Sequence, residues 1–423
     1  MQNVITEFAG RSISELAQKH GTPFFLYNQK KIEQRIEDLQ SFDLVRYAQK
    51  ACSNLALLTL MKNKGVVVDA VSAGEILRAL KVGYRPESHP PGIVFTADLF
   101  DTDAMEAIST HRIPVNVGSP DMITQLGRFS PGAKVTLRVN PGFGHGHSRK
   151  TNTGGEWSKH GIWHSQVAEC LRLGKEAGVF IHGLHMHIGS GTDLEHLSQV
   201  CDAMVKVAKQ IGPKLDVISA GGGLPIPYRH DQEGIDLDAY FKLWDKARKE
   251  LEKDFGHAVR LEVEPGRYLV AESCILVTQI RSMKKVDGNP FILVDAGFDA
   301  LVRPAMYGSY HEISICPADG RTLTTTQDVV VAGPLCESGD VFTQEEGGVV
   351  VTRKLPEAKV GDYLILHDTG AYGSAMSSNY NTRRLAPEIL VHEGQDEVIR
   401  ERQSYDHLLQ FERIPERLKG GAH

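Results

Sequence analysis

The chain repeats one pattern eight times between about residues 45 and 265, and this alternation limits the possible folds more than any other feature. A short run of β-forming residues ends in polar residues or glycine, and a stretch with helical periodicity follows. The eight runs are VRYAQ, VVVDAV, IVFT, PVNVG, KVTLRVN, IHGLHMHIG, LDVISAGG and RLEVEPG. Helical stretches such as NLALLTLMKNKG lie between them, and several end in Gly, as helix C-caps do. Eight regular units predict a closed (β/α)8 barrel of the TIM type, with a doubly wound sheet as the alternative.

The pattern changes after about residue 270, where helical stretches become few. The runs CILVTQI, FILVDAG, DVVVAG and DYLILHD are separated by turns rich in Gly, Pro and Asp, which predicts an all-β second domain, a sandwich or a barrel. We expect the barrel over residues 21–270, with KKIEQRIEDLQ as an extra helix before its first strand, and the β domain over 271–415. Residues 1–20 are candidates to pack with the β domain. Residues 418–423 have the character of an expression-tag remnant.

The composition is that of an ordinary soluble globular protein, with 41% of residues hydrophobic and 24% charged. A net charge of −6 and the lack of a long basic run argue against a nucleic-acid partner, which would need a basic surface. No run approaches the ~18 apolar residues of a membrane span, and the N-terminus lacks the apolar core of a signal peptide. The 6 cysteines are scattered without a C-x-x-C pair, which favours a reducing compartment and therefore the cytoplasm.

Polar side chains collect where the expected barrel strands end, and barrel enzymes carry their active sites there. Each has an ordinary interpretation, because a lysine after a strand is usually solvated, three glycines can form only a tight turn, and Glu with Arg can be a surface pair. Lys50, however, lies beside an apolar barrel, where a lysine would be desolvated and more nucleophilic. The polar and glycine residues at these ends are Lys50, Asp69, Arg138, Asn140, His187, Ser190, Gly221, Gly222, Gly223, Glu264 and Arg267.

The run GLHMHIGSG places His185 and His187 on one face of a strand, because residues i and i+2 point the same way. Such a pair is how many metal hydrolases present two imidazoles to one zinc ion. A zinc site would also need a further His and a carboxylate at other strand ends, and the sequence offers no such set at a plausible spacing. A metal hydrolase is therefore the weaker hypothesis, and no metal is expected.

The residues at the strand ends match the needs of pyridoxal 5'-phosphate better. This cofactor requires a lysine for its Schiff base, a cup for its phosphate, and an acid at its pyridine nitrogen. Lys50 supplies the first, the glycines 221–223 with Arg267 supply the second, and Glu264 supplies the third. Exposed amide groups in a glycine turn can cradle a phosphate, and late barrel loops commonly do so.

Six motifs, in chain order, resemble those of the fold-type III pyridoxal-phosphate-dependent decarboxylases: YAQKACSN, HMHIGSG, SAGGGL, EPGRYLV, GPLCESGD and HDTGAYG. Three longer stretches, RVNPGFGHGHSRKTNTGGEWSKHGIW, RPAMYGSYHEIS and AGPLCESGDVFTQEEGG, are similar to the bacterial diaminopimelate decarboxylases within that family. The likeness runs from about residue 20 to 410 without large gaps. It implies a barrel followed by a β domain, pyridoxal phosphate as the cofactor, and a homodimer whose active sites lie at the subunit interface.

The resemblance implies a role for each barrel residue. Lys50 matches the Schiff-base lysine, Asp69 an acid near that lysine and the cofactor, His187 the histidine stacked on the pyridine ring, and Ser190 a phosphate contact. His185 is then a supporting or core histidine. The other implied cofactor-binding positions are Gly221, Gly222, Gly223, Glu264, Pro265, Gly266 and Arg267, and Arg267 can also reach the substrate.

Five further positions follow from the same resemblance in the second domain. Cys336 matches the proton-donating cysteine, and Glu337 the substrate contact after it. Arg303 and Tyr307 match substrate contacts, and Tyr372 a tyrosine shared by the substrate and the cofactor phosphate. Cys336 taken alone would be a small buried hydrophobe, but the polar, Gly-rich GPLCESGD around it favours a loop and therefore a site.

The expected reaction is decarboxylation of meso-diaminopimelate to L-lysine and CO2. The far end of this substrate carries an amine and a carboxylate, which suit Glu337 and the planar donors of Arg303. A decarboxylase of the ornithine or lysine type is the alternative, although its substrate would leave Arg303 unused. A racemase would need a tyrosine base opposite Lys50, where this chain offers Cys336. A non-catalytic cofactor carrier would lack the β domain.

Overall fold

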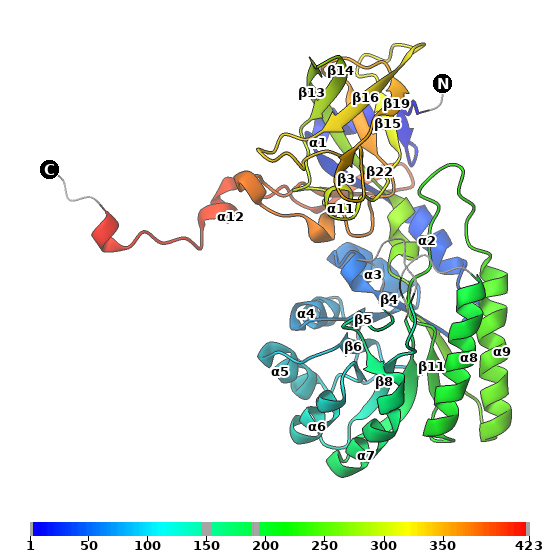
Figure 1. Cartoon of the computed structure of the whole chain (residues 1–423). Helices are drawn as coiled ribbons and strands as arrows, with labels where there is room; N and C mark the ends of the chain where they lie inside the picture. Colours follow the sequence, from blue (N-terminus) through cyan, green and yellow to red (C-terminus); the bar gives the residue numbers. More distant parts are fainter. Residues whose placement is uncertain (1–2, 145–153, 188, 190–193, 420–423) are drawn as a thin grey trace. The chain divides into compact units, whose positions relative to one another are not determined.

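The structure is a computed structural model that describes residues 3–144, 154–187, 189 and 194–419 (Figure 1). The chain forms two compact units. One comprises residues 28–274 and 370–375, and the other comprises residues 1–27, 275–369 and 376–423. We call them the barrel unit and the β unit.

The barrel unit contains eight parallel strands that close on themselves. Strand β12 pairs with β4, and β8 pairs with β10, so the order β4-β5-β6-β7-β8-β10-β11-β12 has no open edge. This arrangement confirms the predicted TIM-type barrel and excludes the doubly wound sheet. The strands are β4 (Leu44–Ala48), β5 (Val67–Ala70), β6 (Ile93–Ala97), β7 (Val115–Val117), β8 (Lys134–Asn140), β10 (Phe180–His185), β11 (Val217–Ser219) and β12 (Arg260–Val263); the short β9 (Ile162–Trp163) extends from β8.

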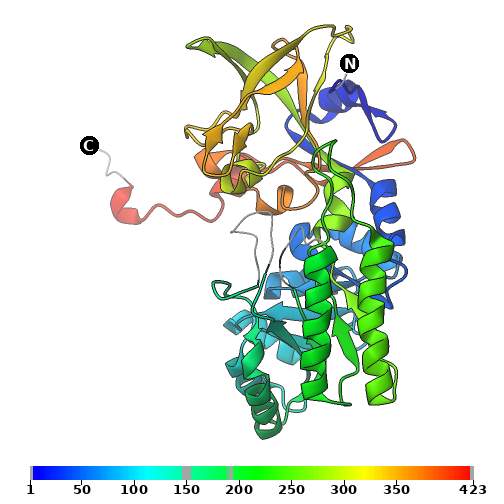
Figure 2. The ribbon, with the colours of Figure 1, turned by 45° about the vertical axis from the view of Figure 1, so that its right-hand side comes forward.

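Helices alternate with these strands and bury their apolar faces on the barrel. Several of them begin at a capping residue: the side chains of Asn54, Ser72 and Asp236 accept backbone N–H groups of the first turn. The helices are α2 (Gln29–Glu37), α3 (Leu55–Asn63), α4 (Ala73–Lys81), α5 (Thr102–His111), α6 (Pro120–Phe129), α7 (Val167–Ala177), α8 (Leu194–Ile211), α9 (Leu237–Phe255) and the short α10 (Arg267–Val270). The long α8 and α9 run side by side, as the two green helices in Figure 2 show.

The β unit is built on a sheet with the path β19-β16-β14-β13-β3-β21-β22, to which β15 and β20 are joined. The predicted β-rich character of this region is confirmed. Its strands are β3 (Phe24–Asn28), β13 (Cys274–Val286), β14 (Asn289–Val294), β15 (Ile313–Cys316), β16 (Thr326–Ala332), β19 (Arg353–Pro356), β20 (Tyr363–Leu366), β21 (Glu388–His392) and β22 (Gln395–Arg400), with the short pairs β1 (Glu7–Phe8) with β2 (Arg11–Ser12) and β17 (Gln344–Glu345) with β18 (Val349–Val350).

The N-terminal segment belongs to the core of the β unit. Helix α1 (Ile13–His20) packs Ile13 and Leu16 against Ile275, Ile365 and Ile389 of the sheet, all of them buried. Two short helices, α11 (Arg303–Tyr307) and α12 (Tyr405–Leu409), complete the unit. Nowhere in the described ranges is there a helix with the length and hydropathy to cross a membrane.

Candidate active site

Lys50 lies in a turn at the carboxyl end of β4 that is fixed from two sides. The Ala48 N–H donates to Pro265 O (3.1 Å), and the Tyr372 N–H donates to Ala51 O (2.9 Å). The Lys50 side chain is exposed, so the expected desolvation of this lysine is wrong for the isolated chain. Strand β4 ends at Ala48, before Lys50, and the charge of Lys50 acts on Asp69 and His187. The exposed Lys50 side chain is accessible to a carbonyl compound.

The glycines 221–223 form a turn that no other residue type could make. Gly221 and Gly223 have positive φ values of 64° and 95°. A Cβ at Gly222 would meet Glu264 O at 2.6 Å, and one at Gly223 would clash with the backbone oxygen of Gly189. The amides of Gly222 and Gly223 donate to no other residue in the part of the chain that the structure describes. Two backbone N–H groups are thus available at the end of β11, as a phosphate cup requires.

Glu264 follows β12 and carries a buried, ionised carboxylate. Its Oε1 accepts the Ser219 hydroxyl (2.8 Å), and its Oε2 lies 3.0 Å from Nε2 of His185. Burial alone would raise the pKa of Glu264, but the charge and hydrogen bond of His185 and the bond from Ser219 outweigh it. The pKa falls to about 2. A carboxylate that stays charged in the barrel can hold a proton on a nearby ring nitrogen.

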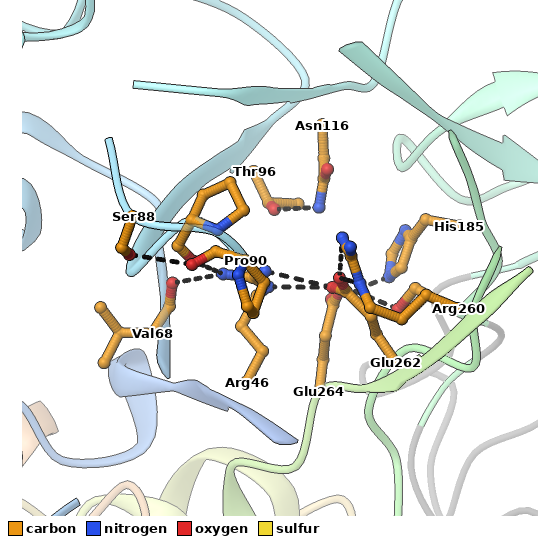
Figure 3. Close-up of polar contacts among 12 residues, drawn as sticks. Arg46, Val68, Ser88, Pro90, Thr96, Asn116, His185, Arg260, Glu262 and Glu264 are labelled. Carbon is orange, nitrogen blue, oxygen red and sulfur yellow. Dashed lines mark hydrogen bonds and ion pairs between the residues drawn. The ribbon is translucent and has the colours of Figure 1, made fainter. Parts of the chain in front are cut away.

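A second layer of charge lies among the strands near Glu264, and Figure 3 shows it. The buried Arg46 donates to Glu262 through Nε and Nη2 (both 3.2 Å), and Arg260 pairs with the same carboxylate (2.7 Å). Arg46 also donates to the backbone oxygen of Pro91 (3.1 Å). Its positive charge adds to the lowering of the pKa of Glu264.

Asp69 has the opposite protonation behaviour to Glu264. Its carboxyl group on β5 is buried, and desolvation together with the negative charge of Glu264 raises its pKa well above the ordinary value. A hydrogen bond from Thr96 and the charge of Lys50 reduce this shift without cancelling it. Two acids whose pKa values are driven apart, as those of Glu264 and Asp69 are, can serve different roles in one site.

His187 lies against the glycine turn. A Cβ at Gly223 would stand 3.2 Å from Cε1 of the His187 ring. Burial, and then the positive charges of Arg138 and Lys50, lower the pKa of His187 well below its ordinary value, so the ring is neutral. A neutral flat ring beside the glycines suits stacking on an aromatic cofactor.

Within the described ranges, no three His, Cys, Asp or Glu side chains are arranged to hold a metal ion.

Arg267 and Tyr372 complete the barrel side of the site. The Arg267 guanidinium lies 5.4 Å from the centre of the Tyr372 ring and donates to the Tyr228 hydroxyl (2.6 Å). Tyr372 belongs to the segment 370–375, which packs with the barrel although it follows most of the β unit in sequence. Pro265 and Gly266 link Glu264 to Arg267, and a Cβ at Gly266 would stand 3.1 Å from Ala48 O.

Arg303 and Tyr307 begin and end α11 in the β unit. Arg303 is buried, and its Nη1 lies 2.8 Å from Nε2 of His311. Since Nδ1 of His311 donates to His367 O (2.7 Å), Nε2 is the acceptor for Arg303. Tyr307 is partly exposed. The guanidinium is therefore oriented by the acceptor nitrogen of His311.

Cys336 and Glu337 lie on an ordered, exposed loop of the β unit. Cys336 is exposed, whereas the other five cysteines are buried, so its predicted position in a loop is confirmed. Its N–H donates to Oδ1 of Asn381 (2.8 Å), and the buried Asp340 carboxylate accepts the N–H groups of Leu335 and Phe298 (both 2.8 Å). The thiol and the Glu337 carboxylate are thus presented to solvent on a fixed backbone.

Two of the residues singled out in the sequence, Asn140 and Arg138, have another role in the structure. A third, Ser190, lies outside the described residues. Asn140 is buried and bonds its own loop, donating to Gly155 O (3.1 Å) and accepting the N–H of Gly142 (3.0 Å). The charge of Arg138 lowers the pKa of both His187 and Asp98.

Sequence reasoning missed the partners of Glu264. Strand register places His185 on β10 beside Ser219 on β11, and Ser219 beside Glu262 on β12. His185, Ser219 and Glu262 therefore lie in one layer at the end of the barrel, two residues before Glu264. Counting residues from the start of each strand could have identified this layer. The sequence alone does not indicate a role for Ser219, because a serine before a run of glycines is common in turns.

The barrel residues fit pyridoxal phosphate by their own chemistry. The site has an exposed amine at Lys50, amides at Gly222 and Gly223 that donate to no described residue, a carboxylate of low pKa at Glu264 and a neutral ring at His187. An ionised carboxylate buried at 5% exposure is costly unless something positive faces it, and a protonated pyridine nitrogen would do so.

The family model described as "Pyridoxal-dependent decarboxylase, pyridoxal binding domain" matches residues 29–271. The chain belongs to the pyridoxal-dependent decarboxylases. Among the members of this decarboxylase family, the diaminopimelate decarboxylase of Escherichia coli (strain K12) is 55% identical over 409 residues, 96% of this chain and 97% of its own. That of Streptomyces coelicolor is 54% identical over 407 residues, covering 96% and 92%.

Solved structures of diaminopimelate decarboxylases are also similar to this chain. A crystal structure of a diaminopimelate decarboxylase is 56% identical, covers 94% of this chain and 95% of its own, and superposes with a TM-score of 0.92. That of the Helicobacter pylori enzyme complexed with L-lysine is 32% identical, covers 94% and 98%, and has a TM-score of 0.84.

Proposed function

We propose that the chain is a diaminopimelate decarboxylase, which converts meso-2,6-diaminopimelate to L-lysine and CO2 with pyridoxal 5'-phosphate. The observation that carries this conclusion is the ionised Glu264 at the strand ends, next to the glycine turn and in the same barrel as the accessible Lys50. The comparisons support the substrate, since curated relatives more than half identical over nearly the whole chain carry that name.

The barrel unit would bind and orient the cofactor. Lys50 would hold its carbonyl carbon, the amides of Gly222 and Gly223 its phosphate, and Glu264 a proton at its ring nitrogen. When bound, the protonated ring stabilises the electron pair left on the substrate carbon as CO2 departs. His187 would cover one ring face and exclude water, and Asp69 would stay neutral beside Lys50. Ser190 remains a proposed phosphate contact.

The β unit would supply the proton and the substrate contacts. The Cys336 thiol would deliver a proton to the carbon that lost CO2, and its exposure on an ordered loop supports that role. Arg303 would bind the far carboxylate of the substrate, and Glu337 the far ammonium. Tyr307, Arg267 and Tyr372 would contact the substrate as well. A decarboxylase acting on ornithine or lysine would have no carboxylate for Arg303.

The enzyme would work as a homodimer in the cytoplasm, with each active site shared between subunits. The two groups of site residues lie in different units of one chain, which is compatible with their meeting across a two-fold axis. All six cysteines are free thiols, as a reducing compartment permits.

The test is an absorbance spectrum of the pure protein before and after borohydride. The cofactor bound to a lysine absorbs near the visible, and reduction fixes it there. Peptide mapping should place the label on Lys50, and a label on a different lysine would contradict the assignment. Release of CO2 from meso-diaminopimelate, compared with ornithine and lysine, then tests the substrate.

A further inference from the structure

Two side chains hold the Glu264 carboxylate directly. Figure 3 shows the ring of His185 directed at Glu264, with Nε2 3.0 Å from Oε2. On the other side the Ser219 hydroxyl donates to Oε1 at 2.8 Å. Both residues are 2% exposed, so water does not compete for these bonds. Because an ionised carboxylate only accepts hydrogen bonds, Nε2 of His185 carries a hydrogen.

The ring of His185 serves Glu264 and no other polar group among the described residues. Nδ1 of His185 is buried and has no hydrogen-bond partner in the described part of the chain, so its interaction with Glu264 is the one polar contact it makes there. Arg46, the nearby cation, gives its bonds to Glu262 and to backbone oxygens and reaches Glu264 only through its charge.

Ser219 also connects Glu264 to the glycine turn. The Gly221 N–H donates to the Ser219 hydroxyl oxygen (3.1 Å), which donates in turn to Glu264. The Glu264 N–H donates back to Gly221 O (2.7 Å). A closed ring of three hydrogen bonds therefore joins the acid to the first glycine of the turn, and neither can shift without the other.

We propose that His185 and Ser219 are positioning residues that hold the Glu264 carboxylate ionised and aimed at the cofactor's ring nitrogen, with Ser219 fixing its spacing from the glycine turn. The proposal rests on the role of Glu264 given under the proposed function. It predicts that losing either residue weakens one interaction, the one with the ring nitrogen, rather than cofactor binding in general.

Equilibrium binding to the cofactor-free full-length protein separates these possibilities. The two probes are pyridoxal phosphate and its 1-deaza analogue, in which a C–H group replaces the ring nitrogen. Wild type should bind pyridoxal phosphate at least tenfold more tightly than the analogue, since a hydrogen bond to a charged group would be lost. Ser219→Ala and His185→Leu should each reduce this preference severalfold, while binding of the analogue changes less than twofold.

Matched controls use the same substitutions elsewhere in the barrel unit. Ser119→Ala removes a hydroxyl that donates to Asp98 O, and His182→Leu alters a histidine on the same strand as His185. Both should keep the wild-type preference. His185→Gln keeps an N–H donor and should restore most of the preference lost in His185→Leu.

Each possible outcome of these binding measurements either supports or overturns the proposal. Equal weakening of both probes in Ser219→Ala and His185→Leu would mean that the two residues only support the fold, and it would overturn the proposal. An unchanged preference in these variants, with a loss in Glu264→Gln, would also overturn it and leave the role of Glu264 intact. If wild type and Glu264→Gln show no preference at all, Glu264 does not face the ring nitrogen, and the proposed function of this residue fails first.

Discussion

Glu264 in the barrel unit and Asp340 in the β unit are both buried acids, and their pKa values shift in opposite directions. In the barrel unit, Glu264 is buried among donors, and its pKa falls to about 2. In the β unit, Asp340 is equally buried, but desolvation and the charge of Asp299 outweigh its two backbone N–H donors and raise its pKa to about 6. The barrel thus maintains a charge where a cofactor would need one, whereas the β unit uses a carboxyl group to shape the Cys336 loop.

This difference indicates a division of labour. The barrel unit brings the candidate cofactor-binding residues together from its own strands, and the carboxylate of Glu264 has His185 and Ser219 as partners. The β unit presents Cys336 and Glu337 to solvent, and only Arg303 is buried there. A variant of a cofactor-binding residue in the barrel should therefore affect cofactor affinity, whereas a variant of a site residue in the β unit should leave that affinity unchanged.

The largest expected effect is that of Lys50→Ala. Turnover should fall by about three orders of magnitude or more, because the covalent attachment and its exchange with the substrate amine are both lost. The free energy of unfolding should hardly change, since the side chain is exposed. Steady-state rates and urea unfolding measure the two quantities. The control is Lys81→Ala, at another exposed lysine of the barrel unit. Normal turnover by Lys50→Ala would contradict the assignment of the cofactor site to the barrel unit.

Arg303→Lys should lower kcat/KM for meso-diaminopimelate by an amount that corresponds to a loss of about 2–3 kcal/mol in transition-state stabilisation. The affinity for the cofactor should stay constant. Lysine keeps the charge but loses the planar fork that grips a carboxylate. Arg281→Lys, at an exposed arginine of the same unit, should be silent. An unchanged specificity constant would show that Arg303 does not contact the substrate, and a loss of cofactor would show that the units are not separable.

Asp340→Asn tests whether the pKa of Asp340 is raised in the folded protein, in contrast to that of Glu264. A carboxyl group whose pKa is raised on folding stabilises the protein at low pH, and that contribution is lost as the pH rises through about 6. Between pH 4 and 7 the wild-type free energy of unfolding should lose about 2 kcal/mol from this group. Asn mimics the neutral acid, so the variant should lack this loss. Glu337→Gln, an exposed carboxylate of the same loop, should retain it, and parallel pH profiles for wild type and Asp340→Asn would refute the assignment.

The smallest signal comes from mixing inactive chains. If each site is shared, dimers of Lys50→Ala and Cys336→Ala that exchange subunits should yield about half hybrids, each with one intact site. Activity should return to about a quarter of the wild-type level. Exchange is verified by mass, and unmixed samples of each variant are the controls. Confirmed exchange without activity would place Lys50 and Cys336 in the same chain's site.

The sequence predicts the barrel well because its signal is local and repeated. Each strand and helix has its own periodicity, and the polar strand ends fall where the fold must place them. It also predicts Cys336 on a loop, since GPLCESGD has no apolar period. It could not predict that Lys50 would be exposed, because that depends on where β4 ends, or that Ser219 would bind Glu264, because that depends on the register between β11 and β12. Such contacts depend on residues distant in sequence.

The return of residues 370–375 to the barrel has a consequence for how this protein can be divided. The polypeptide passes between the two units four times, after Tyr27, Cys274, Thr369 and Ala375. A fragment ending at Cys274 would lack Tyr372, whose N–H donates to Ala51 O next to Lys50. The two units are therefore not interchangeable modules, and a chimera that joins this barrel to another protein's β unit must carry over the short Gly370–Ala375 insert as well.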